Sequence, residues 1–172
     1  MKKAIMLFLM MIGIVLGLSA QTARFAYVWT HRVLAESNDT REAERIYASD
    51  RDTWNSQVED LAGEVRRLES DYEIRRLTLS DTGKAEAEAQ IAAKRREAQQ
   101  LLESLFGENG LAERRNAELL APIVDKMTSI INRIAEDDNY TMVLDASTGV
   151  FLYANDRMNI TQQVIDEMNR AN

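Results

Sequence analysis

An apolar side chain recurs every three or four residues through most of the middle of this 172-residue chain. Between Asp39 and Ala121 there is no proline, and the residues are mostly good helix formers such as alanine, glutamate, arginine and leucine. Two heptad-spaced stripes result, separated by the turn-forming residues Leu79 to Gly83. They predict an antiparallel helical hairpin, whose first helix extends about 60 Å at 1.5 Å per residue. A rod of that length exceeds any globular core of this chain, so we expect it to project as an arm.

The predicted seam of the arm consists of apolar residues at the a and d positions of the two heptad frames. In chain order they are Tyr47, Trp54, Val58, Leu61, Val65, Leu68, Tyr72, Ile91, Ala98, Leu101 and Leu105. The return stripe is rich in alanine, and Gly107 and Gly110 interrupt it as either a hinge or a simple helix break. Ile74, Leu77 and Leu79 lie next to the turn and are the candidate contacts for a protein partner.

Both ends of the chain carry short β-rich runs. Arg24 to Trp29 alternates with a period of two, and both of its faces are apolar. Tyr140 to Ala146 and Val150 to Ala154 are separated by a Ser-Thr-Gly turn, which predicts a hairpin. Before them, a helix is expected to begin at Pro122, a favourable residue for the first helical position. Its apolar stripe is broad, as is typical of a helix that lies on a sheet.

Three short strands cannot bury two apolar faces alone, so we expect them to assemble with the strands of further copies. The candidate residues of this oligomerisation body are Phe25, Tyr27, Val28, Val143, Leu144, Phe151, Leu152 and Tyr153. The predicted fold is α+β, with a small β body formed by the N- and C-terminal strands, pooled between subunits, and a long antiparallel α-helical coiled-coil arm. The body comprises residues 21–38 and 122–172, and the arm comprises residues 39–121 with its turn near 79–83.

The first twenty residues are typical of a secretory signal peptide. Lys2 and Lys3 precede an uncharged run from Ala4 to Ala20, and Ala20 is a suitable small residue before a cleavage point. This pattern predicts export to the periplasm and a mature chain that begins at Gln21. Since Leu18 is larger than the ideal residue near a cleavage site, an uncleaved N-terminal membrane anchor is the alternative.

The charge balance and the residue inventory exclude several classes of function. The net charge is −7, and removal of the two leader lysines makes it more negative, whereas nucleic-acid binding requires clustered lysine and arginine. There is no cysteine, so neither disulfides nor thiol catalysis are available. An exported chain of this size without disulfides requires another means of stabilisation, such as coiled-coil packing or oligomerisation.

The sequence predicts no enzyme, no cofactor and no metal site. His31 is the only histidine, and no serine or aspartate lies at a spacing that suggests a catalytic partner. Asp137 and Asp138 with Asp145 are a conceivable cation site, but an acidic turn that ends a helix explains them better. The Thr-Gly-Lys sequence at Gly83 lacks the first glycine and the following hydroxyl residue of a phosphate-binding loop.

Several blocks of the sequence carry a resemblance to a known family. They are a Pro-Ile helix start (120–124), an aromatic-to-Val-Leu-Asp strand (139–147), a Leu-Tyr-Ala strand (150–154), an Ile-Thr cap (159–165), and Phe-Ala-Tyr-Val followed by Arg-Val-Leu near the start (25–34). With these blocks the chain resembles the Skp/OmpH family of periplasmic chaperones over its whole mature length, although the arm matches in pattern only.

The resemblance implies a homotrimer in which the short strands pool into a central barrel and three arms surround a cavity. It also implies an ATP-independent holdase that encloses unfolded outer-membrane proteins and prevents their aggregation before membrane insertion. Some members of the family are strongly basic, and the acidic balance of this chain argues against lipopolysaccharide or acidic lipid as a partner. The alternative interpretation is a periplasmic coiled-coil spacer or stalk, tethered to the membrane by an uncleaved N-terminus.

Overall fold

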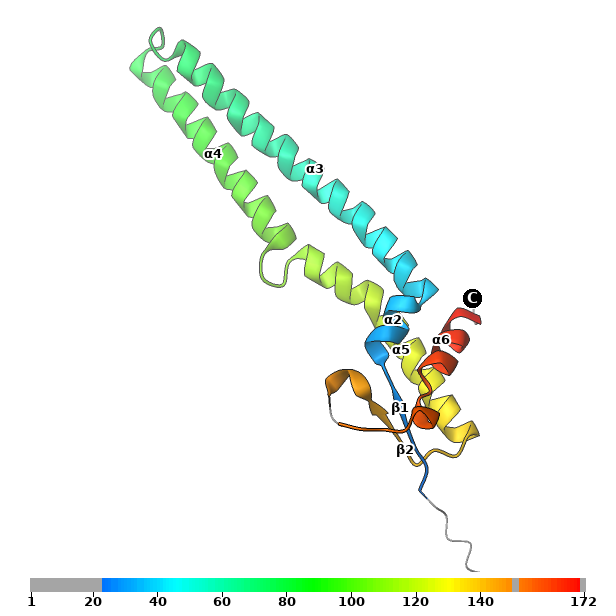
Figure 1. The fold of residues 1–172 in the computed structure, drawn as a ribbon. Helices are drawn as coiled ribbons and strands as arrows, with labels where there is room; N and C mark the ends of the chain where they lie inside the picture. Colours follow the sequence, from blue (N-terminus) through cyan, green and yellow to red (C-terminus); the bar gives the residue numbers. More distant parts are fainter. Residues whose placement is uncertain (1–22, 150–151, 171–172) are drawn as a thin grey trace, which may run out of the picture.

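The computed structural model describes residues 23–149 and 152–170, so the signal-peptide prediction and Phe151 lie outside the described residues. The elements are β1 (Phe25–Val28), α2 (Thr30–Glu36), α3 (Asn38–Arg75), α4 (Asp81–Phe106), α5 (Leu111–Asp137), β2 (Met142–Asp145), the 3₁₀ turns η1 (Ala146–Thr148) and η2 (Asp156–Met158), and α6 (Thr161–Arg170). A long arm of α3 and α4 projects from a small body that contains both ends of the described chain (Figure 1). The predicted α+β class with a helical arm is confirmed.

The arm is an antiparallel pair of helices with capped ends. The 38 residues of α3 extend about 57 Å. The Ser37 hydroxyl accepts a hydrogen bond from the Asp39 N–H (3.2 Å), and the Ser80 hydroxyl accepts one from the Gly83 N–H (3.2 Å). Because Ser80 caps α4, the turn occupies residues 76–80, and Gly83 is already helical. The turn therefore lies slightly earlier than expected, since a serine cap contributes about 1 kcal/mol, close to the cost of one helical glycine.

The return helix is broken at residues 107–110. An added Cβ would lie 2.5 Å from the Glu103 carbonyl oxygen at Gly107, and 2.8 Å from the Gly107 carbonyl oxygen at Gly110. Only glycine fits both positions, and Asn109 between them has a left-handed backbone (φ 55°). Of the two interpretations of this segment, the structure contains the helix break; motion about it remains a prediction.

Helix α5 runs without interruption through Pro122, so the predicted helix start at this residue is wrong. A proline inside a helix costs about 3 kcal/mol because it removes one backbone hydrogen bond and crowds the preceding turn. Packing outweighs that cost, since Ala112 before the proline and Ile123 after it are both buried. Pro122 itself faces solvent.

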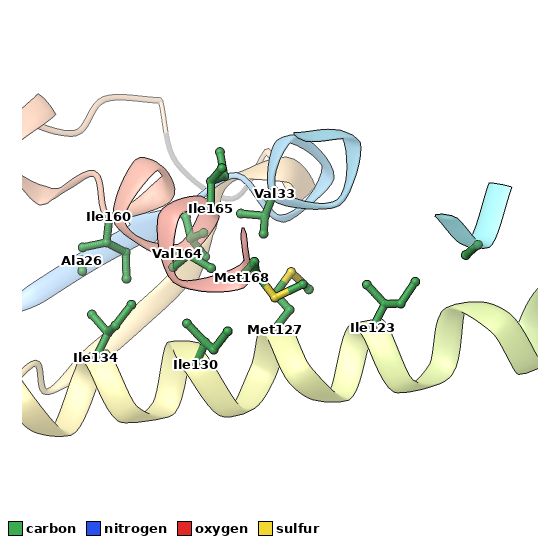
Figure 2. Packing of buried hydrophobic residues seen from close by; sticks show 12 residues of the cluster. Ala26, Val33, Ile123, Met127, Ile130, Ile134, Ile160, Val164, Ile165 and Met168 are labelled. Carbon is green, nitrogen blue, oxygen red and sulfur yellow. The ribbon is translucent and has the colours of Figure 1, made fainter. Parts of the chain in front are cut away.

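The core of the body lies between α5 and a layer formed by α2, α6 and β1. Ile123, Met127, Ile130 and Ile134 form a row along α5 and point toward the other layer (Figure 2). Val33 of α2 and Val164 and Met168 of α6 face them and are fully buried. The enclosure of each such side chain contributes about 1.5–3 kcal/mol. The ends of the chain are therefore joined by one compact apolar cluster.

The sheet joins the two ends of the chain in parallel, with Phe25 opposite Met142 and Val28 opposite Asp145. Among the described residues, which leave out Val150 and Phe151, the predicted hairpin within residues 140–154 does not form. After β2, the Asp145 carboxylate accepts a hydrogen bond from the Ser147 N–H (2.9 Å) and starts η1, and Leu152 to Asn155 form no strand. The partner of β2 is therefore β1, far away in the sequence.

Candidate functional site

An aromatic cluster holds the arm together at the level of the helix break. The Trp54 ring meets the rings of Tyr47 and Phe106 edge to face, with centroid distances of 6.3 and 6.4 Å. Leu105 and Ala112 are buried in the same cluster, which thus joins α3 to both α4 and α5. Of the predicted seam residues, Val58 and Leu101 also pack here.

The outer arm is packed more loosely than its base. Ile91 is buried, whereas Leu61, Val65, Leu68, Tyr72 and Ala98 are only half-buried. Charged groups bridge the helices, including Lys94 to Glu64 (3.1 Å) and Arg95 to Glu69 (2.7 Å). Exposed ion pairs of this kind contribute about 0–1 kcal/mol each. The outer half of the arm is therefore held by a narrow apolar stripe and weak charge pairs.

The predicted contacts near the turn differ in their exposure. Ile74 and Leu77 project into solvent, with 77% and 89% of their surface exposed. Leu79 instead folds back toward Gly83 and lines a 260 Å³ pocket together with Leu68 and Ile91. The structure thus presents two of the three candidate residues to a partner and encloses much of the third.

A further group of exposed apolar residues lies closer to the body. Leu102 and Phe106 on α4 and Leu111 on α5 are each about two-fifths exposed. They were not among the predicted partner contacts, which were the residues next to the turn, Ile74, Leu77 and Leu79. The signal that could have identified them is the four-residue spacing of Leu102 and Phe106, which places both on one side of the helix.

The candidate residues of the oligomerisation body divide into two groups. Tyr27 and Val28 are buried in the subunit, and Val143 and Leu144 are half-buried. Phe25 is 43% exposed, and Leu152 and Tyr153 are almost fully exposed. Met142, opposite Phe25 in the ladder, is half exposed as well. The exposed members form an apolar surface on a sheet that has only two strands among the described residues.

A polar cluster ties η1 to the start of α2. The Asp145 carboxylate accepts hydrogen bonds from the Thr30 hydroxyl (2.8 Å) and the Ser147 N–H (2.9 Å), and the Ser147 hydroxyl lies 2.8 Å from Nδ1 of His31. Burial opposes ionisation of Asp145, but the hydrogen bonds from Ser147 and Thr30 outweigh it and lower the pKa of this carboxyl. In a catalytic triad the carboxylate would orient the histidine, whereas here it binds threonine and serine.

Two of the three acidic residues considered as a cation site, Asp138 and Asp145, have other partners. Asp138 ends α5, and its carboxylate accepts a hydrogen bond from the Gln163 amide (3.4 Å), while Asp145 is engaged by Thr30 and Ser147. Within residues 23–149 and 152–170, no group of three or more histidine or carboxylate side chains could hold a metal ion. No helix in this part of the chain is both long enough and apolar enough to cross a membrane.

Most of this chain matches the model of a known family. The model of a family described as outer membrane protein (OmpH-like) matches residues 24–168. The chain belongs to the OmpH-like family. The matched range begins just before β1 and ends within α6, so it includes the whole arm and confirms the resemblance inferred from the sequence. A comparison with curated proteins finds no match for this OmpH-like chain.

The fold of the OmpH-like chain is also found in a solved structure. It is similar to the crystal structure of a candidate outer membrane chaperone (OmpH-like) from Caulobacter crescentus CB15, with a TM-score of 0.78. The two chains are 13% identical, and the match covers 90% of this chain and 88% of that one. At this level of identity the likeness establishes the shared fold, including the arm.

Proposed function

We propose that this OmpH-like chain is an ATP-independent periplasmic holdase chaperone. It encloses unfolded outer-membrane β-barrel proteins between its arms and prevents their aggregation before membrane insertion. The observation that carries the proposal is the projecting α3–α4 arm with Ile74 and Leu77 exposed at its tip. Clustered exposed apolar side chains usually mark a binding surface. Membership of the OmpH-like family and the likeness to a candidate outer membrane chaperone give further support.

The proposal includes assembly of a homotrimer through the body, residues 21–38 and 122–172, with the arms, residues 39–121, around a shared cavity. The exposed Phe25, Met142, Leu152 and Tyr153 support assembly, because a second copy would cover them. A two-stranded sheet also has open edges that further strands can join. The copy number follows from the resemblance to Skp/OmpH proteins.

Holding and release would depend on many weak contacts. A single exposed leucine or isoleucine contributes little, but several arms that surround one client raise the effective concentration of every contact. Each contact can break separately, so the client leaves when folding and membrane insertion compete, without ATP. Export by the leader, residues 1–20, would place the protein where such clients travel. The net charge of −7 disfavours lipopolysaccharide or acidic lipid as an additional partner.

Light scattering tests the proposal directly. An outer-membrane β-barrel protein is diluted from urea with and without the mature chain, and scattering is expected to fall strongly at one trimer per client. The double variant Ile74→Ser/Leu77→Ser should suppress aggregation less, whereas Val124→Ser, at an exposed position of α5 away from the tip, serves as the control. If the wild-type chain leaves the scattering unchanged at stoichiometric trimer, the holdase assignment is wrong, and a passive spacer explains the arm better.

A further inference from the structure

An apolar groove runs along one side of the arm, away from its tip. It has a volume of about 480 Å³ and lies between α3 and α4. Its apolar lining consists of Val58, Ala62, Val65, Ala98 and Leu102, and we call it the side groove. Leu102 is 42% exposed, whereas the other four are half-buried. The side groove is therefore an accessible strip of apolar surface in a part of the molecule that is otherwise rich in charge.

The spacing of the side chains on α4 suits an extended chain. Ala98, Leu102 and Phe106 are four residues apart, which places them on one face of the helix about 6 Å apart along its axis. In an extended strand, alternate side chains point to the same side and lie about 6.6–6.8 Å apart. Two steps along α4 thus match two steps of a strand to within about 2 Å, a mismatch that flexible side chains can absorb.

Two of the five apolar residues that line the groove are small, which allows a backbone to approach. Ala62 on α3 and Ala98 on α4 contribute only methyl groups to the lining. An extended chain is much thinner than a helix, whose diameter with side chains is about 10–12 Å. The groove therefore suits one extended segment better than an additional helix.

The rim of the side groove carries two guanidinium groups, from Arg66 and Arg95. Arg95 is paired with Glu69 at 2.7 Å, whereas Arg66 makes no ion pair within residues 23–149 and 152–170. The chain as a whole has a net charge of −7, so a rim with two positively charged groups is a local exception to its acidic character. It favours a segment whose polar side chains are neutral or acidic over one whose polar side chains are basic.

We propose that the side groove binds an extended segment in which apolar side chains alternate with neutral or acidic ones. Strands of outer-membrane barrels have this period of two, with apolar residues toward lipid and polar residues toward the lumen. The inference rests on the proposed holdase function and adds to it the pattern that the arm recognises in its clients. A client would then be recognised by its strand pattern before any strand has formed.

Three labelled peptides of identical composition test this inference by fluorescence anisotropy with the full mature chain. The first alternates apolar and polar residues, the second carries the apolar residues in one block, and the third spaces them at the helical period. We expect the alternating peptide to bind about fivefold more tightly than the other two, the change that one apolar contact produces. Two further alternating peptides differ in their polar residues, which are basic in one and acidic in the other. The basic peptide should bind more weakly than the acidic one.

Two substitutions locate the binding in the groove. Leu102→Gln should weaken binding of the alternating peptide about fivefold, because it removes the most exposed apolar side chain of the lining. Ala98→Gln should have a similar effect, because the longer side chain fills part of the groove. The matched control is Val124→Gln on α5, which is 40% exposed and lies outside the groove, and it should bind like the wild type. Circular dichroism verifies that each variant keeps its helix content.

The same proteins in the light-scattering assay separate this inference from the proposed function. If the wild-type chain suppresses aggregation but binds all three peptides equally, or if Leu102→Gln binds like the wild type, the groove inference is wrong and the holdase function stands. If the peptides are ranked as expected but aggregation is not suppressed, the groove inference stands and the holdase function is wrong.

Discussion

The last turn of α6 connects the core of the body to the root of the arm. Met168 is fully buried, and its carbonyl oxygen accepts a hydrogen bond from Nζ of Lys126 (3.1 Å), which also pairs with Asp39 at the start of α3 (2.7 Å). The neighbouring Asn169 amide binds both sides of the α2–α3 junction, since it accepts from the Asn38 N–H (2.8 Å) and donates to the Glu36 carbonyl (3.2 Å). These residues together orient the arm on the body.

Met168→Ala is expected to destabilise the protein by about 2–5 kcal/mol, because it removes a fully enclosed side chain and leaves a cavity. Urea unfolding at a fixed protein concentration measures the free energy of unfolding. Val124→Ala, at an exposed position of α5, should change it by no more than about 0.5 kcal/mol. Equal stability of the two variants would contradict the assignment of Met168 to the core.

Thr30→Val removes a hydroxyl donor to Asp145, so we expect the pKa of this carboxyl to rise toward its ordinary value of about 3.9. Because the folded-state pKa is lowered, the ionised carboxylate stabilises the fold above the unfolded-state value of about 3.9, and this contribution is lost as the pH falls through the folded-state pKa. Carboxyl chemical shifts measure the pKa. Thr128→Val, whose hydroxyl donates to the Val124 carbonyl within α5 (2.9 Å), should leave Asp145 unchanged.

At the scale of elements, the periodicity of the sequence correctly predicted the features that depend on one helix and on the helix next to it. The heptad spacing from Tyr47 to Leu105 predicted the paired helices of the arm, and the glycines at 107 and 110 predicted the interruption. The prediction of a helix start at Pro122 was wrong, because the local preference of proline for that position is outweighed by the apolar stripe that continues on both sides of it. The hairpin prediction failed because strand pattern does not identify the partner, and β2 pairs with β1.

The candidate surfaces, like the helices and strands, were predicted only in part. Ile74 and Leu77 were identified because they lie off the seam, and both are exposed. Leu102 and Phe106 were missed, since their exposure depends on how α4 rotates against α3 and on where the helix breaks. The contact of Ser147 with His31 also could not be predicted, because the parallel pairing of distant strands creates it.

Gly110→Ala is expected to destabilise the protein by about 1–3 kcal/mol, because the new Cβ would lie 2.8 Å from two backbone carbonyl oxygens, those of Leu105 and Gly107. The control is Gly63→Ala in the middle of α3, where the nearest atom to the new Cβ is the end of the Arg66 side chain at 3.8 Å. That variant should gain about 0.5–1 kcal/mol from the better helix propensity of alanine. Thermal unfolding of both variants shows whether position 110 requires glycine for steric reasons or tolerates another side chain.

At the scale of the whole molecule, a small body supports an arm that is several times longer than either strand (Figure 1). The two strands have four residues each, and a sheet of this size has little stability of its own. The apolar residues around it, Leu152 and Tyr153 above all, are exposed to solvent in a single subunit. Assembly through the body would give both the sheet and these residues partners.

Sedimentation equilibrium of the mature chain is expected to give the mass of a homotrimer. Leu152→Ser/Tyr153→Ser should lower the mass toward that of one subunit, because it removes two nearly fully exposed apolar side chains from the proposed interface. Ile74→Ser/Leu77→Ser makes a similar change at the tip of the arm and should leave the mass unchanged. A wild-type chain that sediments as one subunit would contradict assembly through the body.

The parallel ladder between β1 and β2 has a consequence for the order in which the molecule takes shape. Synthesis delivers β1 first, yet its partner follows only after every residue of the arm. Helices close through neighbours in the sequence and form early, whereas this pairing must wait for the end of the chain. The body of a nascent polypeptide of this design therefore cannot close until its final segment has been made, whereas the arm can already be helical.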